Sequence, residues 1–62
     1  MEIEKRIEIL KGKLIGRSYQ VAVKTLGMAS DSKDNQDGTT EYRFGEILIE
    51  LDEKSNLILA VY

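Results

Sequence analysis

Hydrophobic and polar positions form their clearest pattern near the C-terminal end, in the segment GEILIELDEKSNLILAVY of residues 45–62. Two apolar, β-rich runs flank five polar residues, which is the pattern of a β-hairpin with a short loop. In the first run Ile47, Ile49 and Leu51 share one face, whereas residues 57–62 are apolar on both faces. A strand without polar side chains is expected to be covered on both sides. We therefore expect this hairpin to form the hydrophobic centre of the fold.

Residues 2–15 have the spacing of an amphipathic helix. Their apolar side chains recur at intervals of four, three and four residues and form one stripe: Ile3, Ile7, Leu10 and Leu14. We expect the helix to end at Gly16, which can adopt the left-handed conformation that ends many helices. Two heptads are too few for an independent coiled coil, so the stripe is predicted to pack onto the sheet.

Residues 17–26 fit two templates. As a helix the segment aligns Tyr19, Ala22 and Leu26 on one face, and as a strand it aligns Tyr19 with both valines. Glycines bracket the segment, and β-branched and aromatic residues are frequent in it, which favours a strand. The alternative is a second helix, which changes the predicted order of elements to ααββ.

Residues 28–40 are predicted to be an exposed, mobile loop, because their central run SDSKDNQDG contains nothing to bury. Within this loop Asp37-Gly38 is a hairpin-type turn signal, so the chain is expected to reverse there and return antiparallel.

Residues 41–51 are predicted to form one long strand with a break in parity. Tyr42 and Phe44 alternate in one phase and the aliphatic residues after Gly45 in the other. A β-bulge at Gly45 restores a common face, because one extra residue shifts the alternation and glycine is frequent at the left-handed position of a bulge. The alternative is a plain strand that sends the two aromatic side chains to the opposite face.

These elements predict a single small α+β domain covering residues 1–62. Its N-terminal helix packs on a three-stranded antiparallel β-meander, with strands at residues 17–26, 41–51 and 57–62. A chain of 62 residues has a marginal core, and small domains are often supplemented by disulfides, a metal or a partner chain. Cysteine and histidine are absent. Association with another chain is therefore the supplement that we expect.

The location and the chemistry follow from the same composition. No apolar run approaches the length of about 20 residues that a membrane span needs, and the acidic N-terminus does not resemble a secretory signal, so we expect a cytoplasmic protein that does not contact membranes.

Neither a phosphate-binding glycine loop nor a nucleophile with a histidine or cysteine partner is present. The acidic loop fails the EF-hand order, because Lys33 and Phe44 would occupy the first and twelfth positions. We predict no enzymatic activity, no metal site and no cofactor.

An uncovered sheet face is the favoured functional feature. One helix covers one face of a sheet, so four side chains on the opposite face lack a cover within the chain: Leu48, Ile58, Ala60 and Tyr62. Exposed apolar patches of this kind usually mark an interface. We therefore expect a protein–protein interaction module that associates through its sheet, with a second copy or with another protein, in an accessory or inhibitory role. If residues 17–26 are helical instead, that helix is the alternative cover for the second face.

A basic stretch supplies the alternative function. Residues 10–29 contain no acidic residue and carry four cations: Lys11, Lys13, Arg17 and Lys24. Together with aromatic side chains such cations are typical of nucleic-acid-binding proteins. The acidic overall pI, near 5.0, and the small number of aromatics, which the core requires, make this the less favoured hypothesis.

Overall fold

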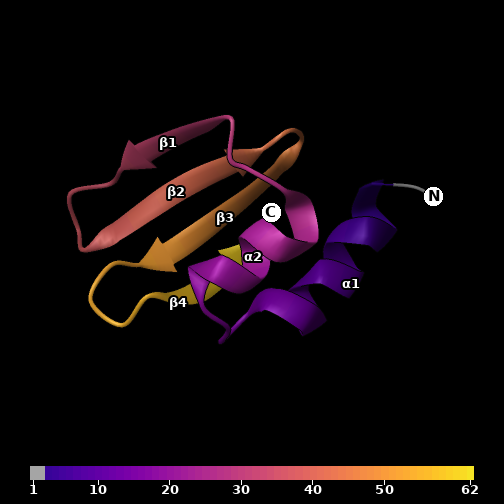
Figure 1. Cartoon of the computed structure of the whole chain (residues 1–62), viewed down its shortest axis with the longest axis horizontal. Helices are drawn as coiled ribbons and strands as arrows, with labels where there is room; N and C mark the ends of the chain where they lie inside the picture. Colours follow the sequence, from indigo (N-terminus) through magenta and orange to yellow (C-terminus); the bar gives the residue numbers. More distant parts are fainter. Residues whose placement is uncertain (1–2) are drawn as a thin grey trace.

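The computed structural model describes residues 3–62, which form two helices followed by four strands (Figure 1). The elements are α1 (Ile3–Leu14), α2 (Tyr19–Leu26), β1 (Asp31–Asp34), β2 (Thr39–Phe44), β3 (Ile47–Asp52) and β4 (Leu57–Val61). The α+β class is thus confirmed. The sheet has four strands, whereas the sequence predicted three.

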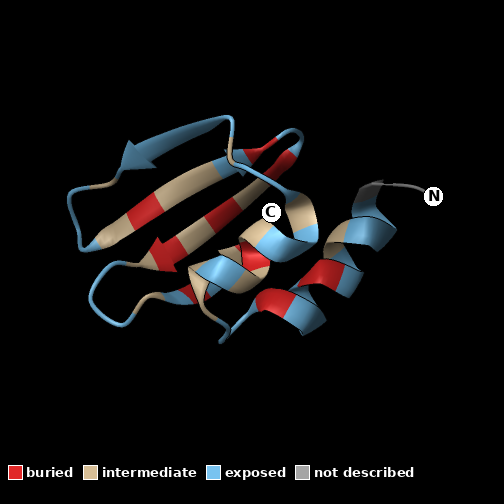
Figure 2. Ribbon diagram, in the orientation of Figure 1, coloured by how far each residue is buried: buried red, intermediate tan, exposed pale blue. Residues whose placement is uncertain are grey.

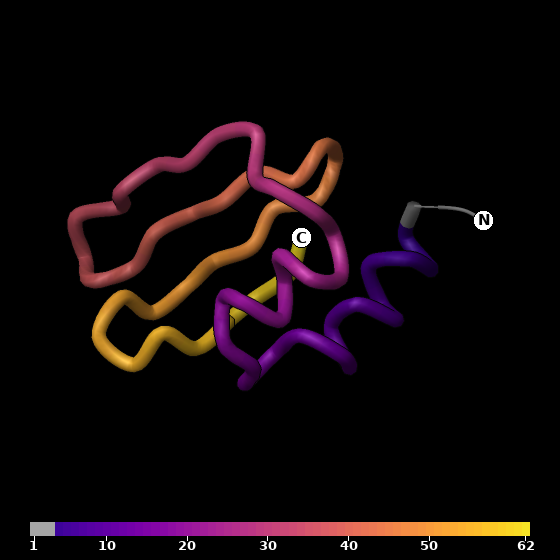
Figure 3. Tube along the Cα trace, in the orientation of Figure 1, coloured from indigo at the N-terminus to yellow at the C-terminus, as the bar shows by residue number. Residues whose placement is uncertain are grey.

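The four strands form one antiparallel meander in the order β1-β2-β3-β4. Each strand is joined to the next by a tight reversal, which the tube in Figure 3 follows from β1 to the C-terminus. Directly opposed residues share a face of the sheet. Tyr42 is opposite Ile49, Phe44 is opposite Ile47, and Ile49 is opposite Val61, so these side chains all project to one side, here called the inner face.

Both helices pack on the inner face. Figure 1 shows them lying together on one side of the sheet, and Figure 2 shows the buried residues along β2, β3 and the two helices. The buried core joins Leu10 and Leu14 of α1 and Ala22 of α2 to inner-face side chains of the strands. The strand residues in this core are Phe44, Ile47, Ile49, Leu51, Ile58 and Val61.

A β-bulge in β4 determines which of its side chains reach this core. Between the opposed pairs Glu50–Ala60 and Leu51–Ile58, β4 contains one extra residue, Leu59. Because the extra residue shifts the alternation by one position, Ile58 and Val61 both turn inward although they are three residues apart. Both are only 1% exposed, whereas Leu59 is 48% exposed.

The prediction of a strand at residues 17–26 is wrong, and the alternative of a second helix describes this segment correctly. Helical spacing buries Ala22 and packs Tyr19, Val23 and Leu26 against the core. Gly27 ends the helix with φ 90°, a conformation that glycine adopts without the steric cost of a Cβ, and its N–H donates to the carbonyl of Val23 at 2.8 Å. The bracketing glycine is therefore a helix terminus.

The α1–α2 connection also pairs with the sheet. Gly16, which has φ 82° just beyond the end of α1, donates its N–H to the Ile58 carbonyl at 2.8 Å, and the Ile58 N–H donates to the Arg17 carbonyl at 2.8 Å. The connection thereby covers part of the free edge of β4. The predicted start of the first helix at residue 2 lies outside the described residues.

The prediction that residues 28–40 form a loop without secondary structure is wrong in part. Residues Asp31–Asp34 form β1, and the chain reverses through the predicted Asp37-Gly38 turn into β2. All four residues of β1 are exposed, so no apolar pattern marks this strand in the sequence. Main-chain pairing with β2 forms it instead.

The single strand predicted at residues 41–51 is two strands. Gly45 and Glu46 form a two-residue turn between Phe44 and Ile47, and Gly45 has φ 64°. A glycine with positive φ at the first position is typical of the tight turns that match the twist of a hairpin. A two-residue turn produces the same change of parity as the predicted bulge at Gly45, which is why the pattern misled.

We predict that Ile58→Ala lowers the free energy of unfolding by about 2–5 kcal/mol, because the substitution leaves a cavity in the core. Leu59→Ala is the matched control and is expected to change it by less than about 1 kcal/mol, since Leu59 is largely exposed. Urea unfolding followed by circular dichroism measures both. A regular β4 without the bulge would reverse this order, because residues 57, 59 and 61 would then face inward.

Candidate interaction surface

The face of the sheet opposite the helices, here called the outer face, is ordered into rows by the strand register. One row contains Asp31, Arg43, Leu48 and Tyr62. The next contains Lys33, Glu41, Glu50 and Ala60. Within residues 3–62 neither helix lies on this face, because the core side chains of both helices meet the inner one. The helices therefore leave the outer face accessible to a partner.

An apolar patch occupies the β3–β4 half of the outer face. We define the outer patch as Leu48, Ala60 and Tyr62. Leu48 and Tyr62 exchange two backbone hydrogen bonds, Tyr62 N–H to the Leu48 carbonyl at 2.8 Å and Leu48 N–H to the Tyr62 carbonyl at 3.2 Å. These bonds hold the C-terminal residue in the sheet, and its side chain stays 56% exposed.

Three of the four residues predicted for an interface thus share the outer face, and the fourth does not. Ile58 lies in the core beneath the helices, because the extra residue Leu59 turns it inward. It is unavailable as a surface contact in the folded chain. Two leucines that the sequence analysis missed are exposed on the same strand, Leu57 at 41% and Leu59 at 48%.

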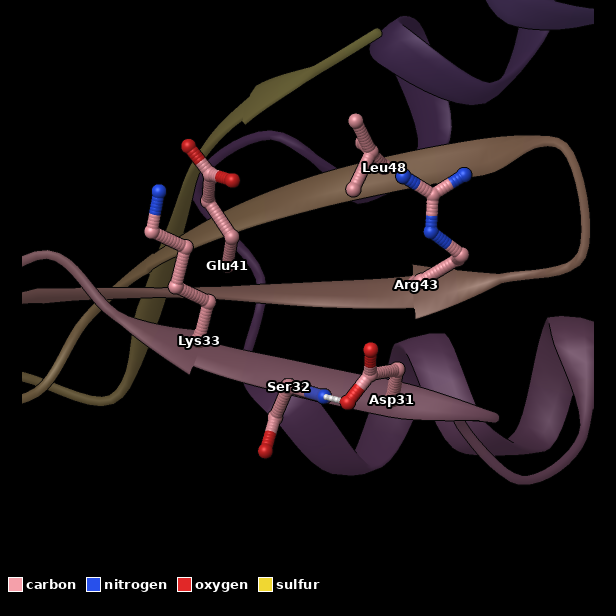
Figure 4. A pocket seen from close by; sticks show the side chains of 6 residues that line it. All are labelled: Asp31, Ser32, Lys33, Glu41, Arg43 and Leu48. Carbon is pink, nitrogen blue, oxygen red and sulfur yellow. Dashed lines mark hydrogen bonds between the residues drawn. The ribbon is translucent and has the colours of Figure 1, made fainter.

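Charged side chains occupy the β1–β2 half of the outer face. Asp31 is opposite Arg43 and Lys33 is opposite Glu41, so charges of opposite sign face each other across these two strands. A depression of about 120 Å³ lies among them and reaches Leu48. Figure 4 shows it with the helices behind the sheet, the Arg43 guanidinium beside Leu48 and the Lys33 side chain beside Glu41.

One pair on the outer face opposes like charges. Glu41 of β2 lies directly opposite Glu50 of β3, and both are partly buried. Like charges directly opposite each other in a sheet are unfavourable. Lys33 faces Glu41 from its other side, whereas Glu50 has the uncharged Ala60 on its other side, so a cation supplied by a partner would act mainly on Glu50.

The four predicted basic residues do not belong to the sheet. Lys11 and Lys13 lie on α1, Arg17 on the connection and Lys24 on α2, and all four are exposed. Lys11 forms a surface ion pair with Glu8 at 3.8 Å.

The aromatic residues near this basic stretch pack with each other. Tyr19 and Tyr42 have ring centroids 4.4 Å apart, and Tyr19 and Phe44 have centroids 6.2 Å apart. Phe44 is buried, and both tyrosines pack against the core. These three rings pack on one another and on the core, while the exposed aromatic Tyr62 lies on the sheet.

Among the titratable groups of the described residues, two have a shifted pKa, Asp37 and Tyr19. In the part of the chain that the structure describes, no three of the aspartates and glutamates gather where they could hold a metal ion. Hydrogen bonds donated by Thr39, from its hydroxyl and its backbone N–H, lower the pKa of Asp37, and this carboxylate stabilises the turn before β2. Burial raises the pKa of Tyr19, and the neighbouring Tyr42 raises it further.

Comparison of the chain with protein-family models, with curated proteins and with solved structures finds no match in any of the three. Neither α1 nor α2 is long and apolar enough to cross a lipid bilayer.

The raised pKa of Tyr19 predicts a loss of stability at alkaline pH. Above its ordinary value of 10.0 the unfolded chain releases the phenol proton while the folded chain retains it, so the free energy of unfolding falls as pH rises. Replacing Tyr19 with Phe removes this titration and should flatten the decline between about pH 9.5 and 11. Urea unfolding across that range measures the slope, and equal slopes for the two proteins would contradict the prediction.

Proposed function

We propose that the chain is a cytoplasmic, non-enzymatic interaction module that associates through the outer face of its sheet, with a second copy of itself as the partner. The observation that carries this proposal is the outer patch. Leu48, Ala60 and Tyr62 lie side by side on a sheet face that neither helix covers. Apolar patches of this kind on a small domain are typical of interfaces.

The size of the domain supports self-association. Nine apolar residues are buried in the part of the chain that the structure describes, and a domain of this size buries little apolar surface by itself. A four-stranded sheet with four to six residues per strand offers a footprint of roughly 20 by 20 Å. This area is at the small end of specific interfaces, for which we expect a dissociation constant in the micromolar range or weaker.

The mixture of charges on the outer face favours a second copy over a partner whose surface carries charges of one sign. The face carries both cations and anions, with Arg43 and Lys33 on one half and the Glu41–Glu50 pair at its centre. A twofold-related copy presents the same groups in reverse order, so its cations can approach the glutamates. Such an isologous contact would relieve the like-charge repulsion and cover the outer patch at once.

A foreign protein is the alternative partner, which corresponds to an accessory or inhibitory role. The same patch would then be buried against a different surface. The two partners are distinguished by the behaviour of the isolated chain, because only self-association depends on its own concentration.

Tyr62→Lys is predicted to shift the monomer–dimer equilibrium toward monomer and to raise the dissociation constant at least about tenfold. The substitution places a charge in the outer patch, and exposed tyrosines are frequent anchors of interfaces. Sedimentation equilibrium from about 10 μM to 1 mM, spanning the weak affinities expected for small interfaces, measures the change.

Ile9→Lys is the matched control for this experiment. Ile9 is 48% exposed on α1, which packs on the inner face, so the same change of charge there should leave the equilibrium unaltered. A wild-type chain that remains monomeric over the whole concentration range would exclude the second copy as partner. Equal effects of the two variants would exclude the outer patch as the contact.

The exposed cations of the helical layer supply a second, weaker proposal. Lys11, Lys13 and Lys24 are exposed on the two helices, which pack on the inner face, and Arg17 is exposed on the connection at the edge of β4. This placement leaves the basic residues accessible to a polyanion even in a dimer formed through the sheet.

If this surface binds nucleic acid, binding must weaken steeply with salt. Each phosphate contact contributes a slope of about −0.9 for duplex DNA in a plot of the logarithm of affinity against that of salt concentration. Fluorescence anisotropy with single- and double-stranded oligonucleotides at two salt concentrations tests this, with Lys11→Glu, Lys13→Glu and Arg17→Glu combined as the disrupting variant. Absence of binding at low salt, where the phosphate attraction is strongest, would exclude this function.

A further inference from the structure

A groove lies between α2 and the edge strand β1, on the inner side of the sheet. It has a volume of about 400 Å³ and is lined by side chains of Tyr19, Val23, Met28, Ser32 and Tyr42. Met28, in the connection from α2 to β1, is 88% exposed at its rim. We call this space the α2–β1 groove. It is distinct from the outer patch, which lies on the opposite face and at the other end of the sheet.

The edge strand beside the groove directs some of its main-chain groups away from β2. The N–H of Asn35 donates to the Thr39 carbonyl at 3.0 Å, which sets the phase of the hydrogen bonds between β1 and β2. In an antiparallel pair such bonds involve every second residue. Asp31 and Lys33 are therefore in phase to bond with β2, and Ser32 and Asp34 direct their N–H and C=O groups to the free edge.

The same register determines where the side chains of an added strand would lie. Ser32 is opposite Tyr42 and so shares the inner face with it. A residue that paired with Ser32 from outside would extend this row and share its face. Its side chain would enter the α2–β1 groove, passing over the small Ser32 to reach the apolar walls formed by Val23 and Met28.

We propose that an extended peptide segment of another protein adds antiparallel to β1 as a fifth strand, with an apolar or aromatic side chain opposite Ser32 inserted into the α2–β1 groove, a basic residue opposite Asp31 and an acidic residue opposite Lys33. Main-chain hydrogen bonds to Ser32 and Asp34 supply the pairing, and the groove selects the inserted side chain. This division between backbone pairing and a side-chain pocket is general in recognition by strand addition.

The register determines which charges the peptide should carry. Asp31 and Lys33 flank Ser32 and share the outer face of β1, so an antiparallel strand with its apolar residue opposite Ser32 is complementary when it places a basic residue opposite Asp31 and an acidic residue opposite Lys33. The Asp31 carboxylate accepts the Ser32 N–H at 2.8 Å and occupies the position that an incoming carbonyl would take. A short, charged edge of this kind resists pairing with strands that lack complementary charges. A neighbouring lysine on the peptide would draw the carboxylate aside and free the N–H.

The test uses the heptapeptide Thr-Val-Glu-Phe-Lys-Val-Thr with a fluorophore at its N-terminus. Alternation places its valines and phenylalanine on one face, and on the other face its glutamate lies opposite Lys33 and its lysine opposite Asp31. We expect saturable binding by anisotropy, and the amide shifts in nuclear magnetic resonance spectra should be largest around Ser32 and Tyr42. A peptide with an N-methylated phenylalanine should bind about tenfold more weakly, because one backbone donor is lost.

Two variants of the protein locate the site. Ser32→Pro removes the outward N–H, a change that edge strands tolerate, and should raise the dissociation constant about tenfold, whereas Ser32→Thr retains the N–H and should bind like wild type. Met28→Lys places a cation at the groove rim and should weaken binding about fivefold. Ile9→Lys is its control, because Ile9 is an exposed apolar residue of α1 away from the groove.

Three results would overturn the proposal. These are the absence of saturable binding up to about 1 mM peptide, the limit of weak association, unchanged affinity in both Ser32→Pro and Met28→Lys, and shifts centred on Leu48 and Ala60 instead of on Ser32. The Met28→Lys variant keeps the test decisive if Ser32→Pro fails to fold. None of these results depends on whether the outer patch forms a dimer, which sedimentation tests separately.

Discussion

The structure depends on how the last strand sorts its side chains between the two faces of the sheet. If the six apolar residues 57–62 alternated regularly, residues 57, 59 and 61 would face the helices and residues 58, 60 and 62 would face outward. The extra residue Leu59 changes this division. Ile58 and Val61 both enter the core, while Ala60 and Tyr62 remain outside. Because each buried aliphatic side chain contributes roughly 1.5–3 kcal/mol of transfer free energy, the two inward residues of β4 together contribute roughly 3–6 kcal/mol to a small core.

The arrangement of β4 determines the face of the sheet on which both helices pack. They cover the one face that the bulge makes continuously apolar, and the turn between them closes part of the β4 edge through the two hydrogen bonds with Ile58. The opposite edge, β1, is short and charged, which protects it from indiscriminate pairing. What stays uncovered is the outer face with its apolar half, and the α2–β1 groove where the helical layer stops short of the edge strand.

The sequence predicted the α+β class, the helix that α1 forms and a strand where β4 lies. The remaining differences have physical causes. Residues 17–26 satisfy both periodicities, and the helical one prevails because it buries Ala22 and packs Leu26 on the core. The strand β1 has no apolar residue. It forms through main-chain pairing with β2, which the pattern of apolar and polar residues does not reveal. A tight turn at Gly45-Glu46 and a β-bulge at Gly45 produce the same change in the alternation of side chains, so the sequence pattern does not distinguish them.

The candidate site was predictable to a similar extent. Leu48, Ala60 and Tyr62 share a face as their spacing and the hairpin register imply. Ile58 was misplaced, because in an apolar run nothing marks which residue is the extra one, and the same displacement hid the exposure of Leu59. The α2–β1 groove had no signal in the sequence, since it is formed by residues that converge only through the fold.

The measurement that tests the central claim most directly is the solvent exposure of methyl groups in dilute solution, read from their relaxation by a soluble paramagnetic agent. With the bulge at Leu59, the methyls of Leu59 and Ala60 relax rapidly, while those of Ile58 and Val61 are protected together. Rapid relaxation of Ile58 together with protection of Leu59 would show a regular β4 and contradict the division of its side chains between a covered and an open face.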